Sequence, residues 1–363
     1  MREARRLFEC QNCGQVVFFE NQTCGRCGDR LGFLPQAVTL SALEPSGNGW
    51  TALAEPGSEW RPCANAEFDV CNWLVPASSP ERFCTACRHN RTVPDLSDAA
   101  NLAAWGKMER AKHRLFYTLL CLGLPTPNRN DDPANGLVFD FLTDSEEPGG
   151  SKVMTGHEDG LITLAVAEAD DAEREARRAR MGEPYRTLLG HFRHEVGHFY
   201  WDRLIRDGQR IGAYRAIFGD ESEDYGAALK RHYAEGPPAG WQQHFVSAYA
   251  ASHPWEDWAE SWAQYLHIVD SLETAASFGL EVHPSIDPDR VLRTDAAIAP
   301  YGSQPFNILV QHWLPLTIAL NAMNQSMGLN DLYPFVLSPA VITKLNFIND
   351  VVHDRVRAAE NGG

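Results

Sequence analysis

The sequence of 363 residues has no run of about 18 apolar residues, the length with which an α-helix begins to span a membrane. Its start, MREARRLFECQNCG, also lacks the apolar segment of a secretory signal. Both absences lead us to expect a cytoplasmic protein. Basic charge is scarce as well, because 32 lysines and arginines stand against 48 aspartates and glutamates, a net charge of −16. So acidic a chain repels phosphate backbones, which argues against nucleic acid as a partner.

Cysteine is almost absent after residue 90. Eight of the nine cysteines come before that point, and only Cys121 follows it. In a reducing compartment such clustering indicates metal binding rather than disulfide bonds. The length of the chain allows two or three domains, so we expect one or two small metal-binding modules ahead of a larger domain.

The first four cysteines have the spacing of a zinc ribbon, with CQNCG at 10–14 and CGRCG at 24–28. Each CxxC turn aims two thiolates at one point, and the glycine that follows permits a positive φ. Four thiolates in tetrahedral geometry make a closed, structural zinc site. We place this ribbon at residues 1–38. Its expected ligands are Cys10, Cys13, Cys24 and Cys27.

A second cysteine group lies in the predicted module 39–95 and is less regular. Its members are Cys63, Cys71, Cys84 and Cys87. Only the last two have CxxC spacing, so a second structural zinc site with four cysteine ligands is the favoured interpretation among several. The alternatives are a redox-active Cys84–Cys87 pair, an iron–sulfur cluster, or His89 in place of one thiolate. Both groups leave no coordination position open, which assigns them to folding or to docking of a protein partner.

From residue 96 to 363 the pattern is mainly helical, with a helix predicted over 101–124 and Asp95 or Ser97 as its cap. Two later segments, 136–142 and 160–169, have strand character. A charged run at 170–183 is either an exposed helix or a mobile loop. The pattern predicts an α+β chain in which two small zinc modules precede a mainly helical domain with a small sheet.

A long helical segment that opens near Pro184 carries His194, Glu195 and His198. Residues four apart lie on one face of a helix, so both imidazoles can bind one metal ion. Glu195 can accept the proton of a zinc-bound water, whose pKa the metal lowers. This HExxH pattern is typical of zinc peptidases. The alternative is two ordinary histidines on a core helix.

The third metal ligand must come from elsewhere, because Trp201 and Leu204 stand where the metzincin extension needs glycine and histidine. The segment HPWEDWAESWAQYLHIVD begins another helix at Pro254, with Ser252 or His253 as its cap. That helix supplies glutamates four residues apart. The histidines His244, His253 and His267 are rival ligands.

HEVGH at 194–198 followed by EDWAE at 256–260 resembles the gluzincin arrangement of zinc peptidases, HExxH plus ExxxE or ExxxD. The resemblance implies that Glu256 is the third zinc ligand and that Glu260 hydrogen-bonds a ligand histidine. The ExxAE form is similar to that of the lethal-factor group, which has a tyrosine seven residues before the ligand glutamate. Tyr249 holds that position, which implies a donor to the oxyanion; the alternative is a packing residue.

The chain as a whole is similar to a bacterial family of zinc-ribbon-containing, zinc-binding metallopeptidases. Besides the HEVGH helix, the similarity rests on four stretches. They are FECQNCGQ, CANAEFDVCNWLVP, FCTACRHNRTVPDLS and DLYPFVLSPAVITKLNFI. The family is named for its motifs, so the similarity supports the fold and the metal but identifies no substrate.

Zincin folds carry a small twisted sheet whose edge strand pairs with an extended substrate peptide. GLITLAVA at 160–167 is the candidate for that edge strand. Its unbroken apolar run favours a central, buried strand instead.

Together these patterns predict a zinc-dependent peptidase, most simply an endopeptidase acting on a peptide or protein. They predict three zinc ions, one catalytic and two structural. One alternative is a recruiting protein whose ribbons bind a partner and whose zincin-like domain has little turnover. Another is a protease of DNA-bound proteins, against which the acidic charge weighs.

Overall fold

A computed structural model describes residues 7–47, 49–144, 153, 155–181, 187–295 and 298–354, without the side chains of 177–181. The chain divides into two compact units, residues 1–174 and 175–363. The finer boundaries expected from the sequence stay a prediction.

The first unit begins with a two-stranded antiparallel sheet of β1 (Leu7–Glu9) and β2 (Val16–Phe18). The segment between the two CxxCG turns supplies strand β2, which pairs with β1, the strand that precedes the first turn. A single bridge between Thr23 and Arg30 joins the two sides of the second turn.

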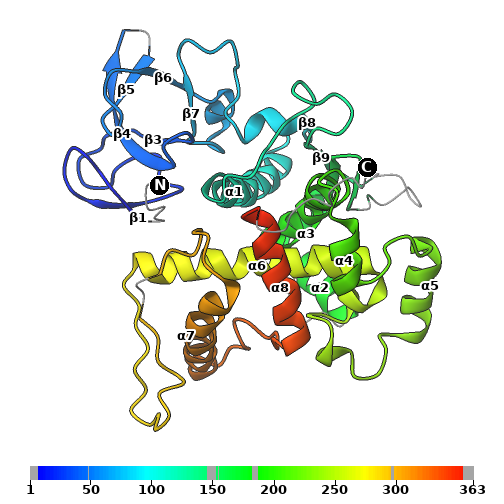
Figure 1. The fold of residues 1–363 in the computed structure, drawn as a ribbon. Helices are drawn as coiled ribbons and strands as arrows, with labels where there is room; N and C mark the ends of the chain where they lie inside the picture. Colours follow the sequence, from blue (N-terminus) through cyan, green and yellow to red (C-terminus); the bar gives the residue numbers. More distant parts are fainter. Residues whose placement is uncertain are drawn as a thin grey trace, which may run out of the picture. The chain divides into compact units, whose positions relative to one another are not determined.

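A five-stranded antiparallel meander follows, in which each strand pairs with the next along the chain (Figure 1). Its strands are β3 (Leu31–Leu34), β4 (Thr39–Ser46), β5 (Gly49–Ala52), β6 (Glu59–Pro62) and β7 (Leu74–Pro76). The meander buries a small apolar cluster to which every strand contributes one side chain. The cluster consists of Leu34, Leu43, Ala52, Trp60 and Leu74.

Helix α1 (Ala99–Cys121) confirms the predicted helix but not its predicted cap. Asp98 caps it, because its extended backbone lets the carboxylate accept hydrogen bonds from Ala100 and Asn101. The carboxylate of Asp95 is occupied by the backbone N–H and hydroxyl of Ser97. The expectation of Asp95 or Ser97 as cap was therefore wrong by one to three residues.

The first unit also contains a four-stranded mixed sheet in the order β10-β11-β9-β8. Its strands are β8 (Asn90–Thr92), β9 (Val138–Leu142), β10 (Gly156–Glu158) and β11 (Leu161–Ala165). The segment GLITLAVA supplies β11, which has a neighbour on both sides. The edge-strand assignment is therefore wrong, and the central position that its apolar run favours is correct. The charged run that follows forms helix α2 (Asp171–Met181).

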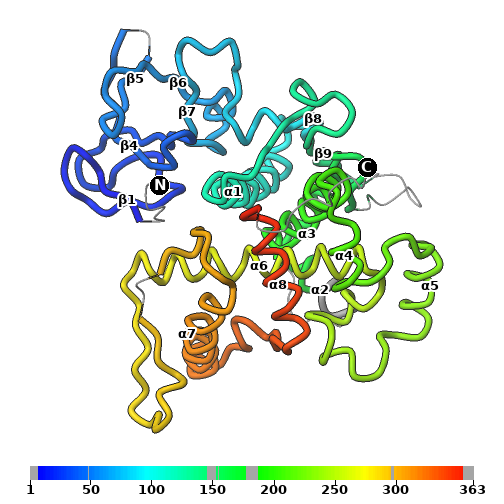
Figure 2. The backbone as a smooth tube through the Cα atoms, viewed as in Figure 1, coloured from blue at the N-terminus to red at the C-terminus, as the bar shows by residue number. Residues whose placement is uncertain are grey.

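The regular elements that the structure describes in the second unit are helices, and a long segment in which it describes neither helix nor strand separates α6 from α7 (Figure 2). Its helices are α3 (Leu188–Trp201), α4 (Ile211–Phe218), α5 (Tyr225–Glu235), α6 (Pro254–Ser277), α7 (Phe306–Ser326) and α8 (Pro339–Val352). Thr187 caps α3 by accepting from the N–H of Gly190 at 3.0 Å. Pro184, the expected start, lies outside the described residues. His253 caps α6 as one of the two expected residues, accepting from the N–H of Trp255.

Helices α3 and α6 approach closely because a glycine faces a tryptophan-rich surface. A Cβ on Gly197 would lie 3.1 Å from the Cα of Ala259 and 3.1 Å from the ring of Trp262. The indole N–H of Trp258 donates to the carbonyl of Gly197 at 2.8 Å. A buried ion pair between Arg193 on α3 and Asp270 on α6 ties the helices further along. These contacts fix the two helices that carry the candidate metal ligands.

Two four-cysteine clusters in an N-terminal β region, followed by a mainly helical part with a small mixed sheet, confirm the predicted α+β class. Within the described residues, no helix has the length and apolar character that crossing a membrane requires.

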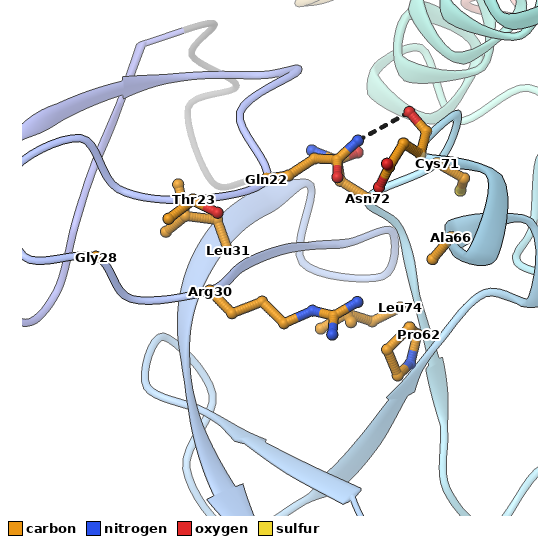
Figure 3. A pocket seen from close by; sticks show the side chains of 11 residues that line it. Gln22, Thr23, Gly28, Arg30, Leu31, Pro62, Ala66, Cys71, Asn72 and Leu74 are labelled. Atoms are coloured by element: carbon orange, nitrogen blue, oxygen red, sulfur yellow. Dashed lines mark hydrogen bonds between the residues drawn. The ribbon is translucent and has the colours of Figure 1, made fainter.

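A polar cavity of about 280 Å³ lies beside the second cysteine group (Figure 3). Arg30 and Leu74 form part of its wall, and the amide of Gln22 donates to the carbonyl of Asp69 at its rim. Its lining contains none of the histidines or glutamates of the HExxH and ExxAE motifs.

Candidate metal centres and active site

The first four cysteines converge as their spacing predicts. The sulfur atoms of Cys10 and Cys27 are 3.6 Å apart, as are those of Cys13 and Cys24. Zn–S bonds of about 2.3 Å in a tetrahedron separate sulfurs by roughly 3.8 Å, so the group has the size of a zinc site with four thiolate ligands. Backbone N–H groups of Cys27 and Arg26 lower the pKa of Cys24 to about 6, which favours the thiolate that a metal binds.

The second cysteine group also converges, and all four members are buried. The sulfurs of Cys71 and Cys84 are 3.8 Å apart. His89, considered as a replacement ligand, is not part of the converging group, and its Nδ1 donates to the carbonyl of Leu137 at 2.7 Å. The histidine that contacts this group is His113 of α1, whose Nε2 lies 3.4 Å from the sulfur of Cys71. Sequence spacing gave no signal for His113, since it lies 26 residues beyond the last cysteine of the group.

In the second unit, three side chains from two helices meet at one point. Nε2 of His194 is 3.0 Å from Oε2 of Glu256, and Nε2 of His198 is 3.6 Å from the same oxygen. Bonds of about 2.1 Å to a tetrahedral zinc would separate such ligand atoms by roughly 3.4 Å. The three atoms therefore have the spacing of a metal site with a free fourth position.

The environment of Glu256 fits a bound cation. Its Oε2 is buried and receives no hydrogen bond of good geometry from the described residues. Buried carboxylate oxygens rarely lack a partner, and a metal ion bound between the two histidines and Glu256 would provide one for this oxygen. Burial opposes ionisation, but the nearby imidazoles of His198 and His194 hold the pKa of Glu256 well below its usual range.

His194 is oriented from behind by a chain of two hydrogen bonds. Its Nδ1 donates to Oε1 of Glu260 at 2.7 Å, which leaves Nε2 to face Glu256. The hydroxyl of Ser247 donates to the other oxygen of Glu260 at 2.6 Å. Such partners set the tautomer of a metal-binding histidine. Burial opposes protonation, yet the bonds to Glu256 and Glu260 raise the pKa of His194, so this position attracts positive charge.

Two tyrosines stand at the site, one expected and one not. The ring of Tyr249 lies 6.0 Å from that of His194. Tyr225, at the start of α5, donates its hydroxyl to Oε1 of Glu256 at 2.7 Å. Burial raises the pKa of both tyrosines, so both keep their protons. Tyr225 was missed because it lies 31 residues before its partner and follows no spacing rule.

Glu195 lies between the two histidines in the sequence and forms no hydrogen bond or ion pair with the described part of the chain. Burial raises its pKa above that of an ordinary glutamate. A carboxylate that is held near a cation site but not tied to a partner can accept and return a proton.

The three rival histidines occupy other positions. His253 caps α6, and Nδ1 of His267 accepts from the guanidinium of Arg193. Neither these two nor His244 belongs to any cluster of three or more potential metal ligands in the described residues.

Comparison with known proteins agrees with this organisation. Residues 101–351 match the model of a family described as "Putative zinc-binding metallo-peptidase", and residues 7–98 match that of a zinc-ribbon domain. The chain belongs to this zinc-ribbon-containing metallo-peptidase family, as the sequence similarity predicted.

Among its relatives are uncharacterised proteins of Mycobacterium bovis and Mycobacterium tuberculosis. Each is 44% identical over 350 residues, which is 96% of this chain and 96% of the relative. No solved structure matches the chain significantly.

Proposed function

We propose that the protein is a zinc-dependent peptidase with its metal held by His194, His198 and Glu256. The convergence of two imidazole nitrogens and one buried carboxylate oxygen, with Oε2 of Glu256 otherwise unsatisfied, carries the proposal. Bound there, zinc would supply a Lewis acid for the peptide carbonyl and would lower the pKa of water.

The chain's own residues would supply proton transfer, orientation of the ligand histidine and stabilisation of the oxyanion. Glu195 accepts a proton from the attacking water and later delivers it to the leaving amine. Glu260 keeps Nδ1 of His194 protonated, so that the lone pair of Nε2 faces the metal. Tyr249 donates its hydroxyl to the oxyanion that develops on the carbonyl. The expected substrate is an internal bond of a peptide or protein.

The experiment compares wild type with Glu195→Gln on a peptide library read by mass spectrometry. Glutamine keeps the size of the side chain but cannot accept a proton. We expect cleavage to fall by roughly 10²–10⁴-fold while zinc content is unchanged. Glu281→Gln is the matched control, because Glu281 pairs with His283 on the surface.

The outcomes separate the candidate functions. Equal cleavage by Glu195→Gln and wild type would refute the assigned base. A wild-type protein with full zinc and no cleavage of any peptide would favour the recruiting function. Cleavage that requires DNA, with salt-dependent DNA binding, would favour a protease of DNA-bound proteins.

A further inference from the structure

We propose that the second cysteine group is completed from outside its own module, by His113 of helix α1 acting as a hydrogen-bond donor to the thiolates. The metal at this group would then hold α1 and the mixed sheet in place, as well as the cysteine loops. The inference rests on zinc binding by the second group and is independent of peptidase activity.

Three of the four sulfurs receive a backbone N–H from within the cysteine module. Trp73 donates to Cys71 at 3.4 Å, Cys84 to Cys63 at 3.3 Å, and Cys87 to Cys84 at 3.4 Å. Among the residues that the structure describes, none gives a backbone N–H to the sulfur of Cys87. Nε2 of His113 lies 3.5 Å from that sulfur, at a distance from which it can donate.

Several contacts hold the ring of His113 next to the cysteine sulfurs. Its side chain is buried, its ring lies against that of Trp73 at 5.2 Å, and Nε2 is also 3.4 Å from the sulfur of Cys71. One N–H therefore faces two thiolates. Zinc with four thiolates is doubly negative, and burying such a charge is costly unless donors surround it. The buried second group needs this donor more than the first group, in which Cys27 is exposed.

Two more residues on the same face of α1 extend the connection. Glu109 and Lys112 are fully buried and form an ion pair at 2.7 Å. The amide of Asn90, the first residue of β8, donates to Glu109 at 3.0 Å, and its oxygen accepts from Lys112. The sulfur of Cys87 donates to Oε2 of Glu109 at 3.4 Å. The cluster thus links the cysteine loop, the helix and the sheet strand.

This arrangement crosses the boundary between the two matched family models. The cysteines lie in the region that matches a zinc ribbon, whereas His113, Glu109 and Lys112 lie in the region that matches the metallo-peptidase. We infer that the zinc of the second group is required for the ordered packing of α1, the first helix of the peptidase region.

The test is a pair of variants of the full chain, His113→Phe and His113→Gln. Phenylalanine keeps a ring against Trp73 but has no N–H. Glutamine has an amide N–H at about the position of Nε2 but is a poor zinc ligand. A chelator is titrated, and thiol alkylation of each cysteine peptide is read by mass spectrometry. The first cysteine group serves as the internal control.

We expect His113→Phe to lower the chelator concentration that exposes the second group by about 10–100-fold, with the first group unchanged. His113→Gln should stay within about threefold of wild type, because it keeps the donor. If the same chelator concentration exposes the second group in His113→Phe and in wild type, His113 contributes only packing, and the proposal is overturned. Loss in both variants would make His113 a direct ligand and also overturn it.

A second measurement keeps the proposal testable if His113→Phe does not fold. In the wild type, removal of zinc from the second group should raise hydrogen exchange across α1 and β8. Unchanged exchange there would contradict the proposed link. A wild-type second group that is alkylated before any chelator is added would show that no metal binds it, and would overturn this inference while leaving the peptidase proposal untouched.

Discussion

The cysteine groups and the His194–His198–Glu256 group employ metal-binding side chains in opposite ways. Each cysteine group draws four sulfurs from short loops and turns, and in the second group all four are buried. The histidine–glutamate group takes three atoms from two long helices, so a tetrahedral ion held there would keep a fourth position for water or substrate. Near that position stand Glu195, which has no partner in the described chain, and Tyr249.

The difference concerns how much of each structure would depend on a metal. Around the cysteines the strands are three to eight residues long, so a bound metal would add to the stability that packing supplies. Around the histidines, tryptophans and a buried ion pair fix α3 and α6 without metal. Geometry held in advance by packing is what a catalytic site requires.

The largest expected effect comes from removing all zinc. Structural zinc contributes roughly 10–16 kcal/mol of apparent binding energy, so the cysteine modules should lose their fold. Hydrogen exchange measured by mass spectrometry should show loss of protection over residues 10–28 and 63–92, while α3 and α6 stay protected. An equal loss of protection in α3 and α6 would contradict this comparison, because both units would then depend on metal for folding.

Replacing Gly197 by alanine should disturb the packing between α3 and α6, the helices that carry the candidate metal ligands. The added Cβ would lie 3.1 Å from both Ala259 and Trp262, so the helices must separate. We expect the free energy of unfolding to fall by about 1–3 kcal/mol and zinc affinity to fall with it. Gly212→Ala is the control, because its Cβ meets nothing within 4 Å and alanine favours the helix. Equal denaturation midpoints for the two variants would refute the close approach.

Much of this comparison could be predicted from spacing alone. A CxxC turn or an i, i+4 pair on a helix fixes relative positions locally, so the first cysteine group, His194 and His198 follow from the sequence. Glu256 required a resemblance to known peptidases, because nothing local relates it to a helix that ends 55 residues earlier at Trp201. The β11 segment reads as a strand, but its position in the sheet depends on its neighbours.

Tyr225, Ser247 and His113 could not be predicted, and for a common physical reason. Each contacts a residue that is distant in the sequence or on another element, and such a contact leaves no periodic pattern. The prediction of the α1 cap failed for a more local reason. Three possible acceptors lie within four residues, and only the backbone geometry selects Asp98.

Removing the hydroxyl of Tyr225 should weaken the open site without unfolding it. The hydroxyl donates to Oε1 of Glu256, which leaves Oε2 as the single oxygen that faces the histidines. For Tyr225→Phe we expect a loss of about tenfold in zinc affinity, measured by competition with a chromophoric chelator. Tyr214→Phe removes a hydroxyl that donates to Pro254, so it should lower stability but leave zinc affinity unchanged. The reverse pattern would contradict the positioning role of Tyr225.

The smallest expected effect is a loss of folding stability at low pH that arises from His267 in the second unit. Burial, and then the charge of Arg193, lower the pKa of His267 well below its usual value. The folded state therefore keeps His267 neutral while the unfolded chain protonates it near pH 6.5. Its contribution to stability is complete above that pH and declines as the pH falls below it, by up to about 1.4 kcal/mol per pH unit.

His267→Asn keeps an oxygen that can accept from Arg193 but cannot titrate. Denaturant unfolding at pH 7.5, 6.5 and 5.5 should show that the stability advantage of wild type over the variant shrinks by about 1 kcal/mol below pH 6.5. Acid loss of zinc affects both proteins alike, so it cancels in the difference. His283→Asn, an exposed histidine, should leave the pH dependence of wild type intact. A constant difference between wild type and His267→Asn would show that His267 does not contribute to the pH dependence of stability.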